Sequence, residues 1–111
     1  MSGHGPKPGS LDVSIAQVDG AVRVSLQGEL DLASARKMEE HFASIDEQAP
    51  SRMVVDLGGL TFIDSSGLRV LLLADARARE RGYELVLLPG GEPVQRVFEV
   101  TGALDVLSFE L

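Results

Sequence analysis

The stretch TFIDSSGL, residues 61–68, decides the fold of this chain because a strand gives way to a helix within it. An apolar run at residues 53–55 precedes it and predicts a buried strand, which the pair Gly58-Gly59 is expected to end in a turn. Asp64 is a natural N-cap, since its carboxylate can accept hydrogen bonds from the free N–H groups of a first helical turn. A helix is therefore predicted over residues 65–81, ended by the glycine that follows.

Two segments of alternating apolar and polar residues lie upstream, at residues 11–16 and 22–27. This period predicts two half-buried strands. Asp19-Gly20 between them suits a tight turn, so the two strands are expected to form a β-hairpin. From Asp31 the apolar residues change to helical spacing, which predicts an amphipathic helix that ends before Pro50.

The downstream part continues the alternation of strands and helices. Residues 84–88 predict a strand, residues 94–98 a short third helix ended by Gly102, and residues 106–109 a final extended segment. The order of elements predicts an α/β fold with one mixed sheet. Its first two strands form the hairpin, and right-handed crossover connections supply the helices.

Length and composition limit the organisation and the partners of the chain. A length of 111 residues indicates a single domain. Residues 1–10, rich in Gly and Pro, are expected to form a flexible tail, which leaves residues 11–111 as the domain. The net charge of -7 disfavours nucleic acid and anionic membranes as partners, and the sequence has no cysteine. Apolar runs are too short to span a bilayer, which predicts a soluble, cytoplasmic protein.

The junction at residues 64–66 has two interpretations. Asp, Ser and Ser are ordinary capping residues at the start of a helix, and composition alone favours this structural role. A functional role is suggested by position, because open α/β sheets usually bind ligands at the carboxyl ends of their strands. A helix N-terminus also favours anions, including a phosphate on one of its own serines.

An enzymatic role finds little support in the sequence. Ser66 lacks the G-x-S-x-G turn of a hydrolase nucleophile, and the two histidines, His4 and His41, are not in a recognisable triad arrangement. The Gly58-Gly59 pair is not followed by the Gly-Lys-Ser/Thr pattern of a phosphate-binding loop. We therefore expect neither catalysis nor a cofactor or metal site.

Four segments together resemble a known family. Residues 28–31 (GELD), 54–57 (VVDL), 62–68 (FIDSSGL) and 97–102 (VFEVTG) are similar, in this order, to the STAS domain of bacterial anti-sigma factor antagonists. The likeness extends over roughly residues 11–109, and the motifs in combination are far more specific than any one of them.

The resemblance implies a regulatory function by partner switching. The unphosphorylated antagonist would bind an anti-sigma factor that is also a serine kinase, and so free a sigma factor. Phosphorylation of Ser65 by that kinase would end the interaction, and a serine phosphatase would restore it. The implied partner-binding residues are Glu29, Asp31, Asp64, Ser66, Gly67 and Arg69. The free protein is expected to be a monomer.

Two points stay open at the level of sequence. A STAS module of another assembly, such as a stress-signalling complex or a lipid-transport system, is the alternative function. Arg69 stands where family members often have a small glycine. It follows Ser65 by four residues, so both should face the same side of the predicted helix. Its guanidinium then either reaches a phosphate on Ser65, contacts only the partner, or stays solvated.

Overall fold

The computed structural model describes residues 10–110 and shows a four-stranded mixed sheet with helices, as the sequence predicts. The strands lie in the order β1-β2-β3-β4, which is also their order along the chain. Of the predicted flexible tail at residues 1–10, residues 1–9 lie outside the described residues, whereas Ser10 accepts a hydrogen bond from the Glu29 amide. The elements are β1 (Leu11–Val18), β2 (Ala21–Leu30), α1 (Leu32–Glu47), β3 (Arg52–Ile63), α2 (Ser65–Arg81), β4 (Glu84–Leu88), α3 (Glu92–Thr101) and the 3-10 turn η1 (Ala103–Asp105).

The first two strands form the predicted hairpin. β1 pairs antiparallel with β2, and the turn between them places Asp19 at φ 51° and Gly20 at φ 83°. Two successive residues with positive φ match the right-handed twist of the flanking strands, which explains why Asp-Gly is favoured there. β3 pairs in parallel with β2 and with β4, so each of these two pairs needs a crossover connection; α1 connects β2 to β3, and α2 connects β3 to β4.

β3 corrects one sequence-based prediction, because it does not end at Gly58-Gly59. The strand is 12 residues long and continues past these glycines to Ile63, and its pairing with β2 shifts register twice on the way. Each shift places one extra residue in β3, as in a β-bulge. A Cβ on Gly59 would lie 2.8 Å from the Leu26 carbonyl oxygen, so glycine here permits close strand contact rather than a turn.

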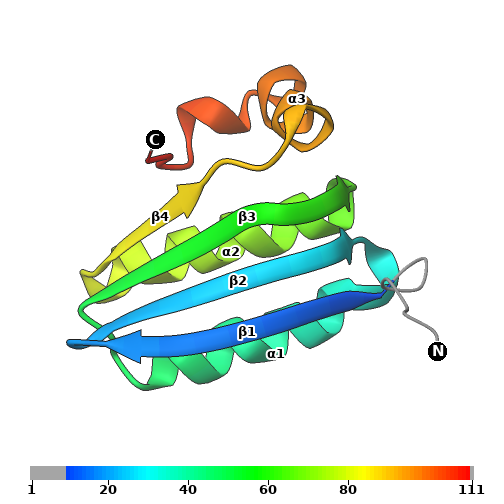
Figure 1. The fold of residues 1–111 in the computed structure, drawn as a ribbon. Coiled ribbons are helices and arrows are strands. Elements are labelled where there is room, and N and C mark those ends of the chain that lie inside the picture. Colours follow the sequence, from blue (N-terminus) through cyan, green and yellow to red (C-terminus); the bar gives the residue numbers. More distant parts are fainter. Residues whose placement is uncertain (1–9, 111) are drawn as a thin grey trace, which may run out of the picture.

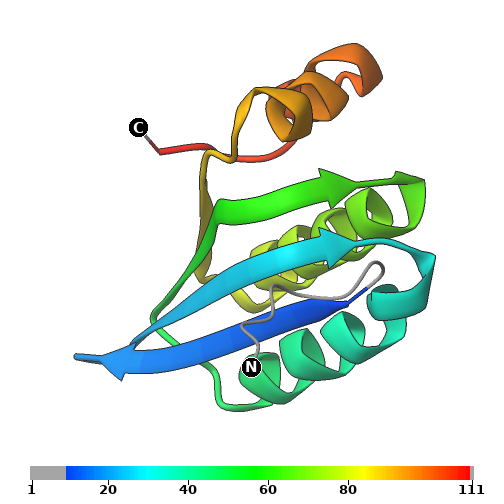
Figure 2. The ribbon, with the colours of Figure 1, turned by 45° about the vertical axis from the view of Figure 1, so that its right-hand side comes forward.

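The core lies between the sheet and its two long helices. Figures 1 and 2 show α1 and α2 on the same face of the sheet. Apolar residues at helical spacing on α1 pack against the alternate residues of the strands that point to this face. The other face carries polar side chains, among them Arg23 and Asp56, which form an ion pair at 2.7 Å. The core side chains with exposures below 2% include Val24, Leu26, Leu30, Met38, Met53, Val55, Leu57, Leu71 and Leu87.

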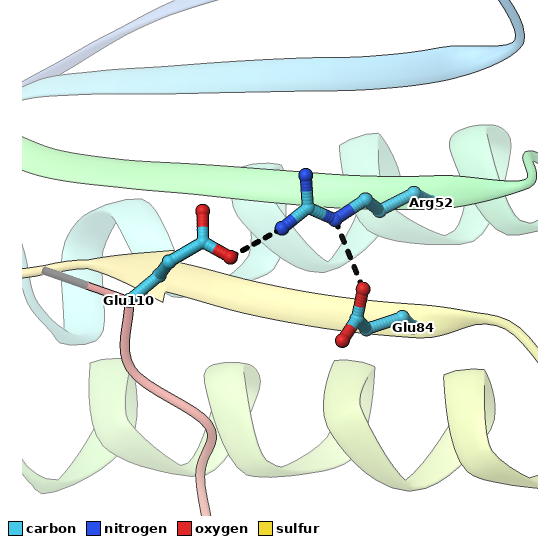
Figure 3. Close-up of polar contacts among 3 residues, drawn as sticks. All are labelled: Arg52, Glu84 and Glu110. Carbon is cyan, nitrogen blue, oxygen red and sulfur yellow. Dashed lines mark hydrogen bonds and ion pairs between the residues drawn. The ribbon is translucent and has the colours of Figure 1, made fainter.

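The C-terminal part differs from the predicted final strand. Residues 103–105 form η1, Val106 keeps a helical backbone, and only Phe109 pairs with the sheet, through a single parallel bridge to Leu87. The segment is also held by side chains: Arg52 of β3 forms ion pairs with Glu84 of β4 and with Glu110 (Figure 3). Among helices over residues 10–110, none has the length and apolar character required to cross a membrane.

Candidate functional site

The candidate site lies at the edge of the sheet where β2 and β3 end. Leu30 and Ile63, the last residues of these parallel strands, are register partners. Each strand is joined to the following helix by a single residue, Asp31 before α1 and Asp64 before α2. Both helices therefore begin side by side at this edge, and the positions of Asp31 and Asp64 in the sequence determine the residue at which each helix starts.

Asp31 caps α1 through contacts within its own turn. Its carboxylate accepts a hydrogen bond from the Ser34 amide at 3.1 Å, and the Asp31 amide donates to the Ser34 hydroxyl at 3.0 Å, which completes a capping box. The same hydroxyl donates to the Glu29 carbonyl at 2.8 Å. Asp31 is thus a fixed, half-buried group rather than a free surface carboxylate.

Asp64 connects the starts of both helices. One carboxylate oxygen, Oδ1, accepts from the amides of Ser66 at 2.9 Å and Gly67 at 3.1 Å, the N-cap contacts predicted from the sequence. The other oxygen, Oδ2, accepts from the Leu32 amide at 3.2 Å, at the first residue of α1. This second contact joins two elements that lie 32 residues apart in the chain and was not foreseen from the sequence.

Gly67 is buried where α2 approaches the end of β2. A Cβ at this position would lie 2.4 Å from the Leu30 carbonyl oxygen and 2.7 Å from Leu30 Cγ. No side chain larger than hydrogen fits there without a backbone shift. Gly67, expected to bind a partner, therefore serves the site by permitting this close approach.

Ser65 is the exposed member of the serine pair. It is the first residue of α2 and is solvent-exposed, whereas Ser66 is half-buried. Within residues 10–110 the Ser65 hydroxyl takes part in no hydrogen bond, so its oxygen is open to approach from outside. Arg69 is exposed one turn further along the same helix, as predicted from the spacing of four residues.

Two apolar side chains near this edge of the sheet are exposed and were missed in the sequence. Leu32 is 77% exposed at the start of α1, and Phe62 is 47% exposed near the end of β3, where its register partner is Glu29. Leu32 lies outside the stripe formed by Met38, Phe42 and Ile45, which is a signal that it points away from the core. Phe62 follows the second bulge of β3, and no sequence pattern marks that bulge. We call Glu29, Asp31, Leu32, Phe62, Ser65 and Arg69 the helix-start surface.

The chemistry of the helix-start surface is that of recognition. Carboxylates and exposed apolar groups accompany the serine on this surface, and among residues 10–110 no histidine lies beside it as a general base, since His41 is in the middle of α1. Across the described part of the chain, no group of three or more His, Asp or Glu side chains is placed to hold a metal ion.

Comparisons with known proteins agree with this geometry. The family model described as Mlab, STAS domain, matches residues 13–108. BtrV of Bordetella bronchiseptica, named as an anti-sigma factor antagonist, is 35% identical over 96 residues, which cover 86% of this chain and 83% of BtrV. RsfA of Mycobacterium tuberculosis, an anti-sigma-F factor antagonist, is 31% identical over 104 residues, covering 92% and 81% of the two chains.

A solved structure shows the same fold. The crystal structure of an anti-sigma factor antagonist from Mycobacterium paratuberculosis superposes with a TM-score of 0.86 at 23% identity, covering 94% of this chain and 88% of that one. The fold, the motifs and the relatives lead to one conclusion: this chain belongs to the STAS domain family, among the anti-sigma factor antagonists.

Proposed function

We propose that the unphosphorylated chain binds an anti-sigma factor that is also a serine kinase, and thereby frees a sigma factor. The observation that carries this proposal is the exposed Ser65 hydroxyl at the start of α2, on a surface that also exposes Leu32 and Phe62. Contact surfaces between proteins combine aromatic and other apolar side chains with a polar rim, and this surface offers both kinds of group. The names of BtrV and RsfA support the same assignment.

The chemical step belongs to the kinase, and this chain contributes the acceptor. The Ser65 Oγ attacks the γ-phosphorus of ATP bound to the kinase, the bond from that phosphorus to ADP breaks, and a base of the kinase takes the hydroxyl proton. A phosphatase hydrolyses the bond between Ser65 Oγ and phosphorus with water, which restores the hydroxyl and releases inorganic phosphate. The chain thus acts as a binding protein, without a cofactor of its own.

Phosphorylation ends binding through charge and bulk at the contact. It adds about 1.5 to 2 negative charges beside Asp64, on a chain whose net charge is already -7. A partner surface that fits the neutral Ser65 hydroxyl would have to bury the charged phosphate in the contact, and this disfavours the complex. The fold tolerates the change because Ser65 is outside the core. The free chain acts as a cytoplasmic monomer in this scheme.

Substitution of the two neighbouring serines tests the assignment. Ser65→Ala is expected to abolish phosphorylation by the cognate kinase while partner binding is retained, and the matched Ser66→Ala is expected to be phosphorylated normally. Mass spectrometry after incubation with kinase and ATP locates the phosphate, and pull-down with the kinase measures binding. Phosphate on Ser66 alone, or normal phosphorylation of Ser65→Ala, contradicts the proposal.

A second candidate is a STAS module of another assembly, such as a stress-signalling complex or a lipid-transport system. The description of the matching family model, which names Mlab, is the observation that favours it. The two candidates differ in their partners: only a partner-switching antagonist captures a kinase-like anti-sigma factor in the unphosphorylated form and loses it after phosphorylation.

A further inference from the structure

We propose that Arg69 binds the phosphate once Ser65 is phosphorylated and serves as its counter-charge within the same helix. This inference rests on the proposed function only for the claim that Ser65 is phosphorylated. It assigns to Arg69 a role in the modified state, in addition to any contact with a partner.

The positions of the two residues permit the contact. Ser65 is the first residue of α2 and Arg69 the fifth, so both lie on one face of the helix, and both are exposed. Arg69 forms no ion pair with any residue in the range 10–110, whereas Arg79 binds Asp75 at 2.8 Å and Arg81 binds Asp46 at 2.9 Å. The guanidinium of Arg69 is therefore uncommitted before phosphorylation.

The start of α2 leaves the phosphate short of other donors. The amides of Ser66 and Gly67 already donate to the Asp64 carboxylate, and the Leu68 amide donates to the Asp64 carbonyl at 2.9 Å. A negative charge thus already occupies the helix N-terminus, where a phosphate would otherwise find stabilisation. The new phosphate lies next to this carboxylate and is repelled by it. A cation is needed at this point.

Arginine suits this task chemically. Its planar guanidinium offers N–H donors in a fork that matches two phosphate oxygens. A nearby cation favours the dianionic form of a phosphate over the monoanion, so the contact lowers the second pKa of phosphoserine. Arg69 therefore increases the charge that the switch carries near neutral pH, where this ionisation takes place.

The test uses protein with phosphoserine installed at position 65 during translation, so that it does not depend on any kinase. The second pKa of the phosphate is measured by ³¹P NMR titration at low salt. Arg69→Ala is expected to raise this pKa by about 0.2 to 0.7 relative to the parent, and Arg69→Lys by less. The difference should shrink in high salt, since the pair is exposed to solvent.

The matched control is Arg77→Ala. Arg77 is an exposed arginine of the same helix without an ion pair among the described residues, and it lies about 18 Å from Ser65 along the helix axis. The Arg77→Ala substitution is expected to leave the second pKa of the phosphate unchanged. An unchanged pKa in Arg69→Ala, or equal shifts in both variants, overturns the proposal. Failure of the kinase to modify Ser65 would contradict the proposed function and leave this titration unaffected.

Discussion

At the scale of single residues, Asp64 holds the starts of two helices with one carboxylate. Asp64→Ala removes the N-cap of α2 and the contact to the Leu32 amide, so we expect it to lower the free energy of unfolding by about 1 to 2 kcal/mol. Asp64→Asn keeps one acceptor oxygen for the α2 amides and should cost less. Urea unfolding measures both variants.

The control for Asp64 is Asp12→Asn on the exposed part of β1. A surface substitution of this kind is expected to change stability by less than about 0.5 kcal/mol. Equal stability of Asp64→Ala and the parent chain would show that the two helix starts do not depend on this carboxylate.

Gly67 sets how closely α2 approaches β2. Gly67→Ala places a methyl group 2.4 Å from the Leu30 carbonyl oxygen, and the forced backbone shift is expected to cost about 2 kcal/mol or more. Gly91→Ala is the matched control, because its Cβ meets no atom closer than Pro93 Cδ at 3.9 Å, and it should cost less than about 1 kcal/mol. Thermal unfolding of both variants decides, and equal losses would contradict the steric explanation.

The sequence predicted the local roles at this surface but not the contacts between elements. The capping role of Asp64 follows from its position before a helix, and so does the exposure of Ser65. The bond from Asp64 to Leu32 and the fit of Gly67 against Leu30 require the parallel register of two strands. The spacing of residues along the chain does not specify which residues of the two strands become partners.

At the scale of elements, a buried carboxylate connects the C-terminal ends of α1 and α2. Asp46 of α1 accepts a hydrogen bond from the Tyr83 hydroxyl at 2.7 Å and pairs with Arg81 of α2 at 2.9 Å. Asp46 is 7% exposed, and these two partners offset the cost of burying its carboxylate. Burial raises the pKa of Tyr83 above its usual value, and the hydrogen bond to Asp46 raises it further.

The buried hydrogen bond between Tyr83 and Asp46 predicts a loss of stability in alkali. A raised folded-state pKa means that the native protein holds the Tyr83 proton more tightly than the unfolded chain does. The associated stability is present below the usual tyrosine pKa of about 10 and is lost as pH rises above it. We expect the free energy of unfolding of Tyr83→Phe to fall less steeply with pH than that of the parent when both are measured from pH 8 to 11. Parallel curves for Tyr83→Phe and the parent would contradict it.

Two elements were predicted incorrectly because the sequence signals have two meanings. Gly58-Gly59 is typical of turns, yet here it permits bulges and close strand contact inside β3. The apolar residues within 106–109 suggested a strand, but only Phe109 pairs with the sheet, through its bridge to Leu87, and side-chain packing supplies the other contacts: Leu107 is buried in the core and Phe109 packs edge-on against Phe98. Helices and the hairpin were predictable because their signals are local.

At the scale of the whole molecule, apolar packing rather than charge should hold the C-terminal segment. The Phe109 and Phe98 rings lie 5.1 Å apart, and Phe98 is fully buried. Phe109→Ala is expected to cost about 1 to 3 kcal/mol. Arg52→Ala removes the exposed pairs with Glu84 and Glu110 and should cost less than about 1 kcal/mol, decreasing with salt. Chemical denaturation at two salt concentrations measures both, and a larger loss in Arg52→Ala would reverse the ranking.

The strand order of the sheet, identical to the chain order, has a consequence for what this fold can bind. In doubly wound α/β proteins the strand order reverses at one point, successive helices diverge to opposite faces, and small molecules bind in the crevice between them. The four strands here show no such reversal, so α1 and α2 stay on one face and their first turns meet through Asp64. The carboxyl edge therefore lacks, within residues 10–110, the crevice between diverging helices at which doubly wound folds bind small molecules, and it presents the starts of α1 and α2 side by side instead.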